Sequence, residues 1–239
     1  MKDSKEHSQK IRLLHRSLKR GRSQYYRTHK IAVQLAVAAG QKPEKVIYDE
    51  PADALVYAII SENITQHQAH SAIHRIKEHF VDLNDLRVSR EDEIAEVLGG
   101  DMPAAGQTAS AITKILAAVF GKYNMVSLKP LRKIGKRPAK QFLEKMDGVT
   151  HFAVNYCMLT SLQGHAIPLT ERMIEYLKNN GMVHPDSSVQ ETEGFLARQI
   201  SAEDAYEFYT MLRHRSETAK GEAKGKKKAV HKTKEKIES

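Results

Sequence analysis

The sequence predicts an all-α protein, and three observations support this fold class. Ala, Leu, Glu, Lys and Met recur through the central part of the chain, and these residues favour helices. The apolar residues there show no alternation of period two, the pattern that marks a half-buried strand. Helix start and stop signals are frequent, which indicates about eight to ten short helices with short connections.

These signals place the expected helices along the chain in order. In the first half they predict a helix opened by Pro51, one running from Ser71 toward Phe80, one capped by Ser89 and closed by Gly99-Gly100, and one over residues 108–121 that ends at Gly121. In the second half they predict a pair of helices over 138–159 opened by Pro138, one capped by Thr170 that stops at Gly181, one started by Ser187 or Ser188, and one capped by Ser201.

Composition limits the class of protein. Apolar residues make up 41% of the 239 residues, enough for a core in one large domain or two small ones. No apolar run approaches the roughly 20 residues of a membrane span, and the N-terminus lacks the apolar stretch of a secretory signal. The single cysteine, Cys157, excludes an internal disulfide and a Cys-rich metal site. We expect a cytoplasmic monomer without cofactor, metal or membrane contact, associated with the nucleoid in a bacterium.

The positive charge is concentrated at the two ends of the chain. Residues 1–30 carry a net charge of +8 and residues 217–239 a net charge of +4, so the +9 total leaves −3 for residues 31–216. Basic tails commonly bind polyanions by releasing counterions. We therefore treat residues 1–23 as a basic N-terminal tail and residues 216–239 as a Lys-rich disordered tail. A purely solubilising role for these tails is the alternative.

Residues 138–159 predict a helical hairpin that can bind phosphate. Asp147, Gly148 and Val149 join the two helices, and so short a turn needs a residue that accepts positive φ, which Gly148 supplies. The amides that begin the second helix, at Thr150 and His151, then point outward with the positive end of the helix dipole behind them. A phosphate fits there, and contacts to the nucleic-acid backbone are indifferent to base sequence.

A basic stretch precedes and enters this hairpin. It is the one concentrated run of positive charge in the otherwise acidic centre of the chain, and each phosphate it neutralises would add to the salt dependence of binding. Its residues are Lys129, Arg132, Lys133, Lys136, Arg137, Lys140 and Lys145. An ordinary helical hairpin with solvated lysines is the alternative interpretation.

Three motifs in the right order resemble the endonuclease III type of the helix-hairpin-helix DNA glycosylase superfamily. The family hairpin, of the type Leu-Pro-Gly-Val-Gly, corresponds to residues 146–150 (MDGVT). Upstream, ALVYAIISENITQ resembles the family helix that ends in Ser-x-Gln-x-Thr, with Ser61, Asn63 and Thr65 in those places. Downstream, HAIPLTERMIEYLKNNGMV resembles the segment that begins a new helix after the hairpin. The likeness covers about two thirds of the chain.

The resemblance implies two helical domains with a cleft between them. A six-helix barrel would span residues 50–165, and the second domain would combine residues 24–49 with residues 166–215. The implied partner is double-stranded DNA, including damaged DNA whose base is turned out into the cleft. Asn63 occupies the place of a side chain that fills the gap left by that base; helix capping or a buried hydrogen bond is its alternative role.

Two family positions lack their reactive groups. Bifunctional members use a lysine of the second hairpin helix as nucleophile, and Phe152 stands there. The family aspartate that begins the next helix corresponds to Thr170, which keeps the cap but loses the carboxylate. The adjacent Glu171 replaces it only after a shift of one residue, and a first-turn acid that favours the helix dipole is its simpler role.

Other features of the family are also missing or weakened. The iron–sulfur cluster of many relatives needs four cysteine thiolates, and this chain has only Cys157. Thr150 replaces the second glycine of the family hairpin, which makes close approach of a phosphate less easy. His67, His70 and His74 share a helix face at a spacing that suits zinc, but we expect a polar or DNA-facing surface there, not a metal site.

These observations lead to three hypotheses. The first is a duplex DNA-binding protein of the superfamily without glycosylase or lyase activity. The second is a base-excision glycosylase with a rebuilt, lysine-independent site, in which Glu171, His151 or Glu62 acts as acid or base on an activated water. The third lies outside DNA repair, with a hairpin that contacts protein and tails that bind RNA.

Overall fold

The computed structural model describes residues 44–100 and 102–218, and every regular element within these ranges is a helix. This confirms the predicted all-α class. The elements are α2 (Pro51–Ser61), α3 (Gln66–His79), α4 (Leu83–Val88), α5 (Glu91–Leu98), α6 (Ala105–Tyr123), the 3-10 helix η1 (Lys129–Lys133), α7 (Lys136–Glu144), α8 (His151–Thr160), α9 (Glu171–Asn179), α10 (Val189–Gln199) and a last helix over residues 205–218.

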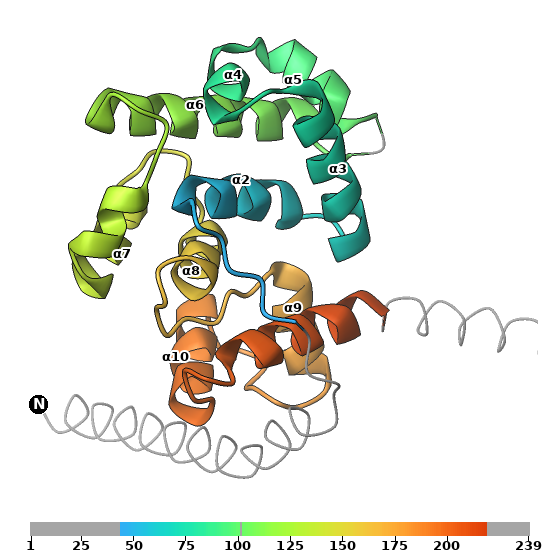
Figure 1. The fold of residues 1–239 in the computed structure, drawn as a ribbon. Coiled ribbons are helices and arrows are strands. Elements are labelled where there is room, and N and C mark those ends of the chain that lie inside the picture. Colours follow the sequence, from blue (N-terminus) through green and yellow to red (C-terminus); the bar gives the residue numbers. More distant parts are fainter. Residues whose placement is uncertain (1–43, 101, 219–239) are drawn as a thin grey trace, which may run out of the picture.

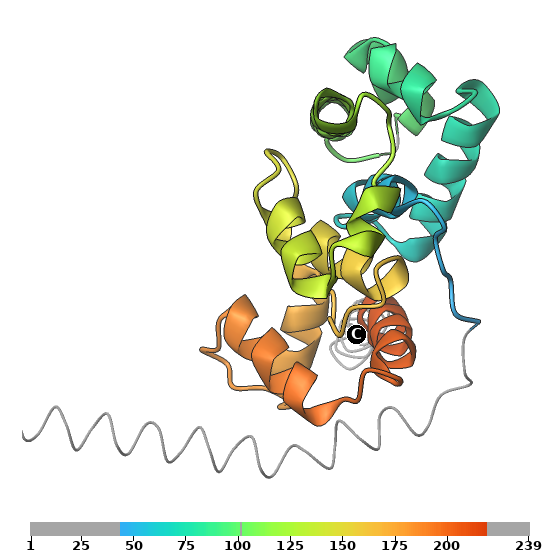
Figure 2. The ribbon, with the colours of Figure 1, turned by 60° about the vertical axis from the view of Figure 1, so that its left-hand side comes forward.

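The helices form two groups at opposite ends of the molecule, with α2 and α8 between them (Figures 1 and 2). The first group contains α3 to α6, in which α5 and α4 pack on α6 and α3 packs on α5. The second contains α9, α10 and the helix over 205–218. The predicted domain boundaries remain a prediction, and residues 24–43 of the predicted second domain lie outside the described residues.

α2 and α8 pack against each other and form the centre of the core. Every residue of α2 except Asp53 is buried, and so is every residue of α8 after His151. A helix that is apolar all round must be covered on all sides, which explains why these two lie between the groups. Cys157 and Tyr156 of α8 are buried, as the sequence predicts for core residues.

Several predicted helix starts are confirmed by hydrogen bonds. Pro51 is the first residue of α2, and the Thr170 hydroxyl accepts from the amide of Met173 to cap α9. Ser188, rather than Ser187, caps α10 in a reciprocal capping box with Glu191. These signals act within one turn of the chain, so local sequence is sufficient to find them.

Several predicted helix boundaries differ from the structure. α3 begins at Gln66, because Thr65 forms a capping box with Gln68, and not at Ser71. Ser89 ends α4 by donating to the Asp85 carbonyl, and α5 begins after Arg90. α6 continues through Gly121 until the left-handed Asn124 (φ 52°) stops it.

The remaining two shifts concern α7 and the last helix. α7 begins two residues before Pro138, at Lys136, because Gly135 has a φ of 90° and ends the preceding segment. Ser201 accepts from the amide of Asp204 within a turn, and the helix itself begins at residue 205. In both cases the polar or proline signal belongs to the neighbouring turn and not to the first helical residue.

Candidate nucleic-acid interface

The turn between α7 and α8 has the geometry that the sequence predicts. Gly148 has a φ of 80°, in the left-handed region where a side chain adds strain. It is exposed, and a Cβ there would meet nothing closer than Ile115 Cγ1 at 3.8 Å, so backbone conformation and not space requires glycine. Thr150 caps α8 by accepting from the Ala153 amide at 3.1 Å. Residues 147–150 therefore interrupt the helices, and Asp147, Gly148 and Thr150 are exposed.

A carboxylate lies directly against this turn. The Thr150 hydroxyl donates to Glu62 Oε2 at 2.7 Å, so Glu62 approaches the start of α8 from the loop after α2. Burial raises the pKa of the Glu62 carboxyl above its ordinary value, although the hydrogen bond from Thr150 lowers it, and the charge of Glu171 raises it further. Glu62 and the exposed Glu171 therefore lie near each other on this side of the molecule.

His151 is tied to α10. Its Nε2 lies 2.5 Å from Glu193 Oε2, and Glu193 Oε1 accepts from Asn155 Nδ2 at 2.9 Å. Burial raises the pKa of Glu193, against the hydrogen bond from His151. His151 thus extends away from Phe152, as the helical spacing predicts, and links α8 to α10.

Phe152 is sealed inside the protein. Its side chain is 2% exposed, and its ring lies 6.0 Å from that of Tyr156 at an interplanar angle of 27°. The guanidinium carbon of Arg213, from the helix over 205–218, lies 5.7 Å from the centre of the Phe152 ring. The position where the resemblance predicts the nucleophile therefore carries a buried aromatic ring that lies beside an arginine.

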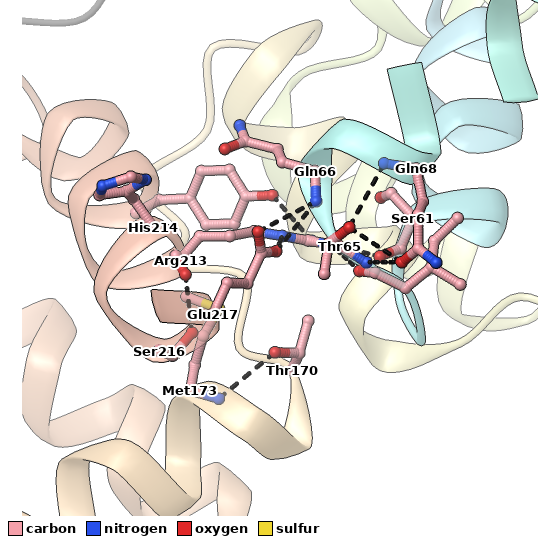
Figure 3. Close-up of polar contacts among 12 residues, drawn as sticks. Ser61, Thr65, Gln66, Gln68, Thr170, Met173, Arg213, His214, Ser216 and Glu217 are labelled. Atoms are coloured by element: carbon pink, nitrogen blue, oxygen red, sulfur yellow. Dashed lines mark hydrogen bonds and ion pairs between the residues drawn. The ribbon is translucent and has the colours of Figure 1, made fainter. Parts of the chain in front are cut away.

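Arg213 bridges the last helix and the loop between α2 and α3 (Figure 3). It is 1% exposed, donates to the carbonyls of Ser61 and of Ile64, the latter at 2.8 Å, and pairs with Glu217 at 2.9 Å. Both oxygens of Glu217 accept from the Gln66 amide at 3.1 Å, where α3 begins. We call this arrangement the Arg213–Glu217 bridge.

The sequence motifs did not predict this bridge, although the last helix carries a local signal for it. Tyr206, Tyr209, Arg213 and Glu217 recur at spacings of three and four, so they share one face of the last helix. A single arginine on an apolar face, with an acid four residues later, indicates a buried ion pair. Its partners in the α2–α3 loop are about 150 residues away and cannot be inferred from spacing.

The basic stretch is exposed along η1 and α7, and part of it is already paired. Lys129 and Arg132 pair with Asp49 at 2.7 and 3.1 Å, and Lys140 lies 3.8 Å from Glu144. Within the described residues, the exposed members without a carboxylate partner are Lys133, Lys136, Arg137 and Lys145. Lys145 follows the C-terminus of α7 and lies next to the turn in the sequence, whereas Lys133, Lys136 and Arg137 lie before or at the start of α7. Lys136 lines a hollow together with Asp49 and Gln163.

Four other residues that the sequence singles out differ in their exposure. Asn63 is exposed in the loop between α2 and α3, and its role in DNA binding remains a prediction. Thr170 is buried as a cap, and Glu171 is exposed at the first turn of α9. Val149 is half-buried against the core, which anchors the turn.

The described residues do not suit a metal or cluster. No group of three His, Cys, Asp or Glu among them is arranged to hold a metal ion. His70 packs on Tyr57 and His74 pairs with Glu78, so two of the three spaced histidines have other partners. The only cysteine of the sequence, Cys157, is fully buried in α8, which does not fit a four-thiolate iron–sulfur cluster. Within residues 44–218, no helix is long and apolar enough to span a bilayer.

Solved structures of DNA glycosylases share this fold. A non-covalent endonuclease III–DNA complex has a TM-score of 0.65 at 17% identity, over 80% of this chain and 85% of that chain. The 8-oxoguanine glycosylase/lyase of Clostridium acetobutylicum, with dsDNA containing cytosine opposite 8-oxoG, has a TM-score of 0.64 at 17% identity, over 81% and 71%. The H. pylori 3-methyladenine DNA glycosylase bound to 1,N6-ethenoadenine has a TM-score of 0.61 at 12% identity, over 82% and 98%.

Neither a family model nor a curated protein sequence matches the chain. At these low identities the structural likeness establishes the fold, and it confirms the predicted helix-hairpin-helix glycosylase architecture.

Proposed function

We propose that this protein is a member of the helix-hairpin-helix glycosylase superfamily that binds duplex DNA without sequence preference and does not release bases. Its binding element would be the turn at Gly148 together with the exposed cations of η1 and α7. The fold shared with DNA-bound glycosylases supports the partner, and the positive φ and exposure of Gly148 support the mode of binding.

The observation that carries the loss of chemistry is the environment of Phe152. A lysine nucleophile needs an amine that reaches the sugar carbon, and here a buried phenyl ring lies beneath Arg213. The carboxylate position is occupied by Thr170, whose hydroxyl is used as a helix cap. The two groups that the family reaction requires are therefore both absent from their positions.

Duplex binding is tested by a matched pair of glycine variants. Gly148→Trp strains a left-handed residue and places a bulky ring where the phosphate would lie, so we expect at least a tenfold loss of affinity for a duplex. Gly121→Trp, at an exposed glycine with nothing within 4 Å of its Cβ position, is the control and should bind as the wild type does. Fluorescence anisotropy with a labelled duplex measures both, and equal affinity of the two variants would contradict the proposed interface.

One observation favours the second hypothesis, an active site rebuilt around Glu62. A carboxyl with a raised pKa beside a second acid, Glu171, is the arrangement from which enzymes build acid–base pairs. A single-turnover assay with oxidised, alkylated, mismatched and abasic duplexes separates the two functions. Base release that Glu62→Gln or Glu171→Gln abolishes, without borohydride trapping, would establish the enzyme and refute a purely binding role.

The third hypothesis is separated by the choice of nucleic acid. If the tails serve RNA and the hairpin serves a protein, structured RNA should bind at least as tightly as duplex DNA at both low and high salt. Under our proposal the duplex binds more tightly, and only duplex binding responds to Gly148→Trp.

A further inference from the structure

Glu193 of α10 holds the side chain of His151, the first residue of α8. His151 Nε2 lies 2.5 Å from Glu193 Oε2, and the other carboxylate oxygen accepts from Asn155 Nδ2 at 2.9 Å. The side chain of Glu193 is 14% exposed and that of His151 is 39% exposed. The carboxylate is therefore fixed by two partners on α8, while part of the imidazole ring reaches solvent close to the turn that contains Gly148.

The contact with Glu193 determines which nitrogen of the neutral His151 ring carries the proton. An ionised carboxylate only accepts hydrogen bonds, so Nε2 must be the donor. In a neutral imidazole the other nitrogen, Nδ1, then has no proton and can only accept. Among the described residues no hydrogen bond engages Nδ1. This nitrogen therefore becomes a donor only when the ring takes up a second proton and turns into a cation.

Nδ1 is also the nitrogen that an anion at the start of α8 can reach. It is bonded to Cγ and so stays nearer the His151 backbone than Nε2, which is occupied by Glu193. Side chains of a helix lean toward its N-terminus, which is where the amides of Thr150 and His151 lie. A phosphate bound there meets a charged donor when the ring is protonated and a lone pair when it is neutral.

The charged groups around this contact belong to the elements that surround the start of α8. Those that interact with His151, or with the carboxylates next to it, are Glu193 of α10, Lys140 of α7, Glu62 of the α2–α3 loop, Glu171 of α9 and Arg213 of the last helix. Three of these groups are acids, and the Arg213 charge is already paired with Glu217. A phosphate therefore approaches against an excess of negative charge, which a proton on His151 partly compensates.

We propose that Glu193 is a positioning residue that makes His151 a proton-dependent contact to a DNA phosphate, so that the duplex binds together with a proton. This inference rests on the proposed binding at the Gly148 turn and adds a condition to it. Affinity should rise as the pH falls through the range of about 5 to 8 in which histidine ordinarily changes charge. Because the slope of log K against pH equals the number of protons taken up, His151 contributes at most about tenfold per pH unit.

Anisotropy titrations of the full chain with one labelled duplex, at fixed salt and between about pH 6 and pH 8, test this contact. The affinity of the wild type should fall about fivefold more over this interval than that of His151→Gln, whose side chain does not titrate. His151→Lys stays charged, so it should bind more tightly than the wild type at pH 8. Glu193→Gln should flatten the profile, because a glutamine can donate to Nε2 and leave the neutral ring with its proton on Nδ1.

A second histidine–glutamate pair provides the matched control. His79 Nε2 lies 3.1 Å from Glu93 Oε1, between α3 and α5 in the other group of helices, so His79→Gln should keep the wild-type profile. Equal profiles of the wild type and His151→Gln, or an equal flattening by His79→Gln, would overturn this inference alone if Gly148→Trp still weakens binding. If Gly148→Trp binds as the wild type does, the proposed function fails and this inference fails with it.

Discussion

At the scale of single residues, Arg213 joins the last helix to the loop between α2 and α3. It is buried, and its hydrogen bonds reach the loop after α2 as well as Glu217 of its own helix. Removal of one member of a buried ion pair leaves the other charge without compensation, which costs far more than the pair itself contributes. Substitution of Arg213 or Glu217 alone should therefore lower the free energy of unfolding more than substitution of both residues together.

We expect Arg213→Met to lower the free energy of unfolding by about 3–5 kcal/mol. Arg213→Met with Glu217→Gln should recover part of that loss, because the stranded carboxylate becomes neutral. Arg215→Met, two residues along the same helix, should change stability by about 0.5 kcal/mol or less. Urea unfolding measures all three, and equal stability of the two single arginine variants would show that the bridge does not hold the groups together.

Glu62 gives a prediction about pH. Its pKa is raised in the folded protein, mainly by burial, so the folded state takes up a proton that the unfolded chain releases. Stability is then highest below the ordinary glutamate pKa and falls as pH rises through the raised value. Glu62→Gln removes this loss and can still accept the hydrogen bond from Thr150.

Glu62→Gln should therefore raise the thermal unfolding temperature at pH 7, by an amount that shrinks as the pH is lowered toward 4. Glu175→Gln, at an exposed residue of α9, is the matched control and should show no such trend. Thermal melts between pH 4 and pH 8 check the sign, and a lower melting temperature of Glu62→Gln at pH 7 would refute this account.

At the scale of helices, the sequence predicted best the features that one turn of chain determines. Thr170, Ser188 and Gly148 were found because a cap or a positive φ depends on immediate neighbours. Ser89 was predicted to begin a helix and Gly121 to end one, and both predictions were wrong because serine and glycine also occur in other positions of a helix. A serine can bond back to the carbonyl four residues earlier, and a glycine on an exposed face can sit inside a helix.

Substitution by alanine should change the stability of the protein in opposite directions at Gly121 of α6 and at Gly148 of the α7–α8 turn. Gly121 is helical and open around its Cβ position, so Gly121→Ala should stabilise the protein by about 0.5–1 kcal/mol. Gly148 has a φ of 80°, so Gly148→Ala should destabilise it by about 1–2 kcal/mol. Chemical denaturation of both variants measures the difference, and a shift of the same sign in both would contradict the assigned backbone geometry.

At the scale of the whole molecule, the sequence predicted the helical architecture but not the burial of Phe152 beside Arg213. Periodicity, caps and the three family-like motifs are local, and they were sufficient for the fold. The burial of Phe152 beside Arg213 depends on two helices that are far apart in the sequence. Only packing brings those segments together, so the spacing within the last helix can indicate a buried arginine but not the residues that it contacts.

The distribution of charge over the whole molecule leads to a prediction about salt. The part of the chain between the tails has a net negative charge, so the proposed DNA binding would rely on the tails and on the lysines and arginines of the basic stretch, such as Lys133 and Lys136. Each lysine that neutralises a phosphate contributes about 0.9 to the slope of log K against log salt concentration. Lys133→Gln with Lys136→Gln should therefore reduce that slope by about 1.8.

Two exposed lysines of α6 provide the matched control for this measurement. Lys114→Gln with Lys122→Gln removes the same formal charge from another surface, so it lowers long-range attraction equally but breaks no phosphate contact. Anisotropy titrations of the full chain between about 50 and 200 mM salt compare the two slopes. If both double variants lose the same slope, net charge and the tails determine binding, and the surface beside Gly148 is not where the duplex lies.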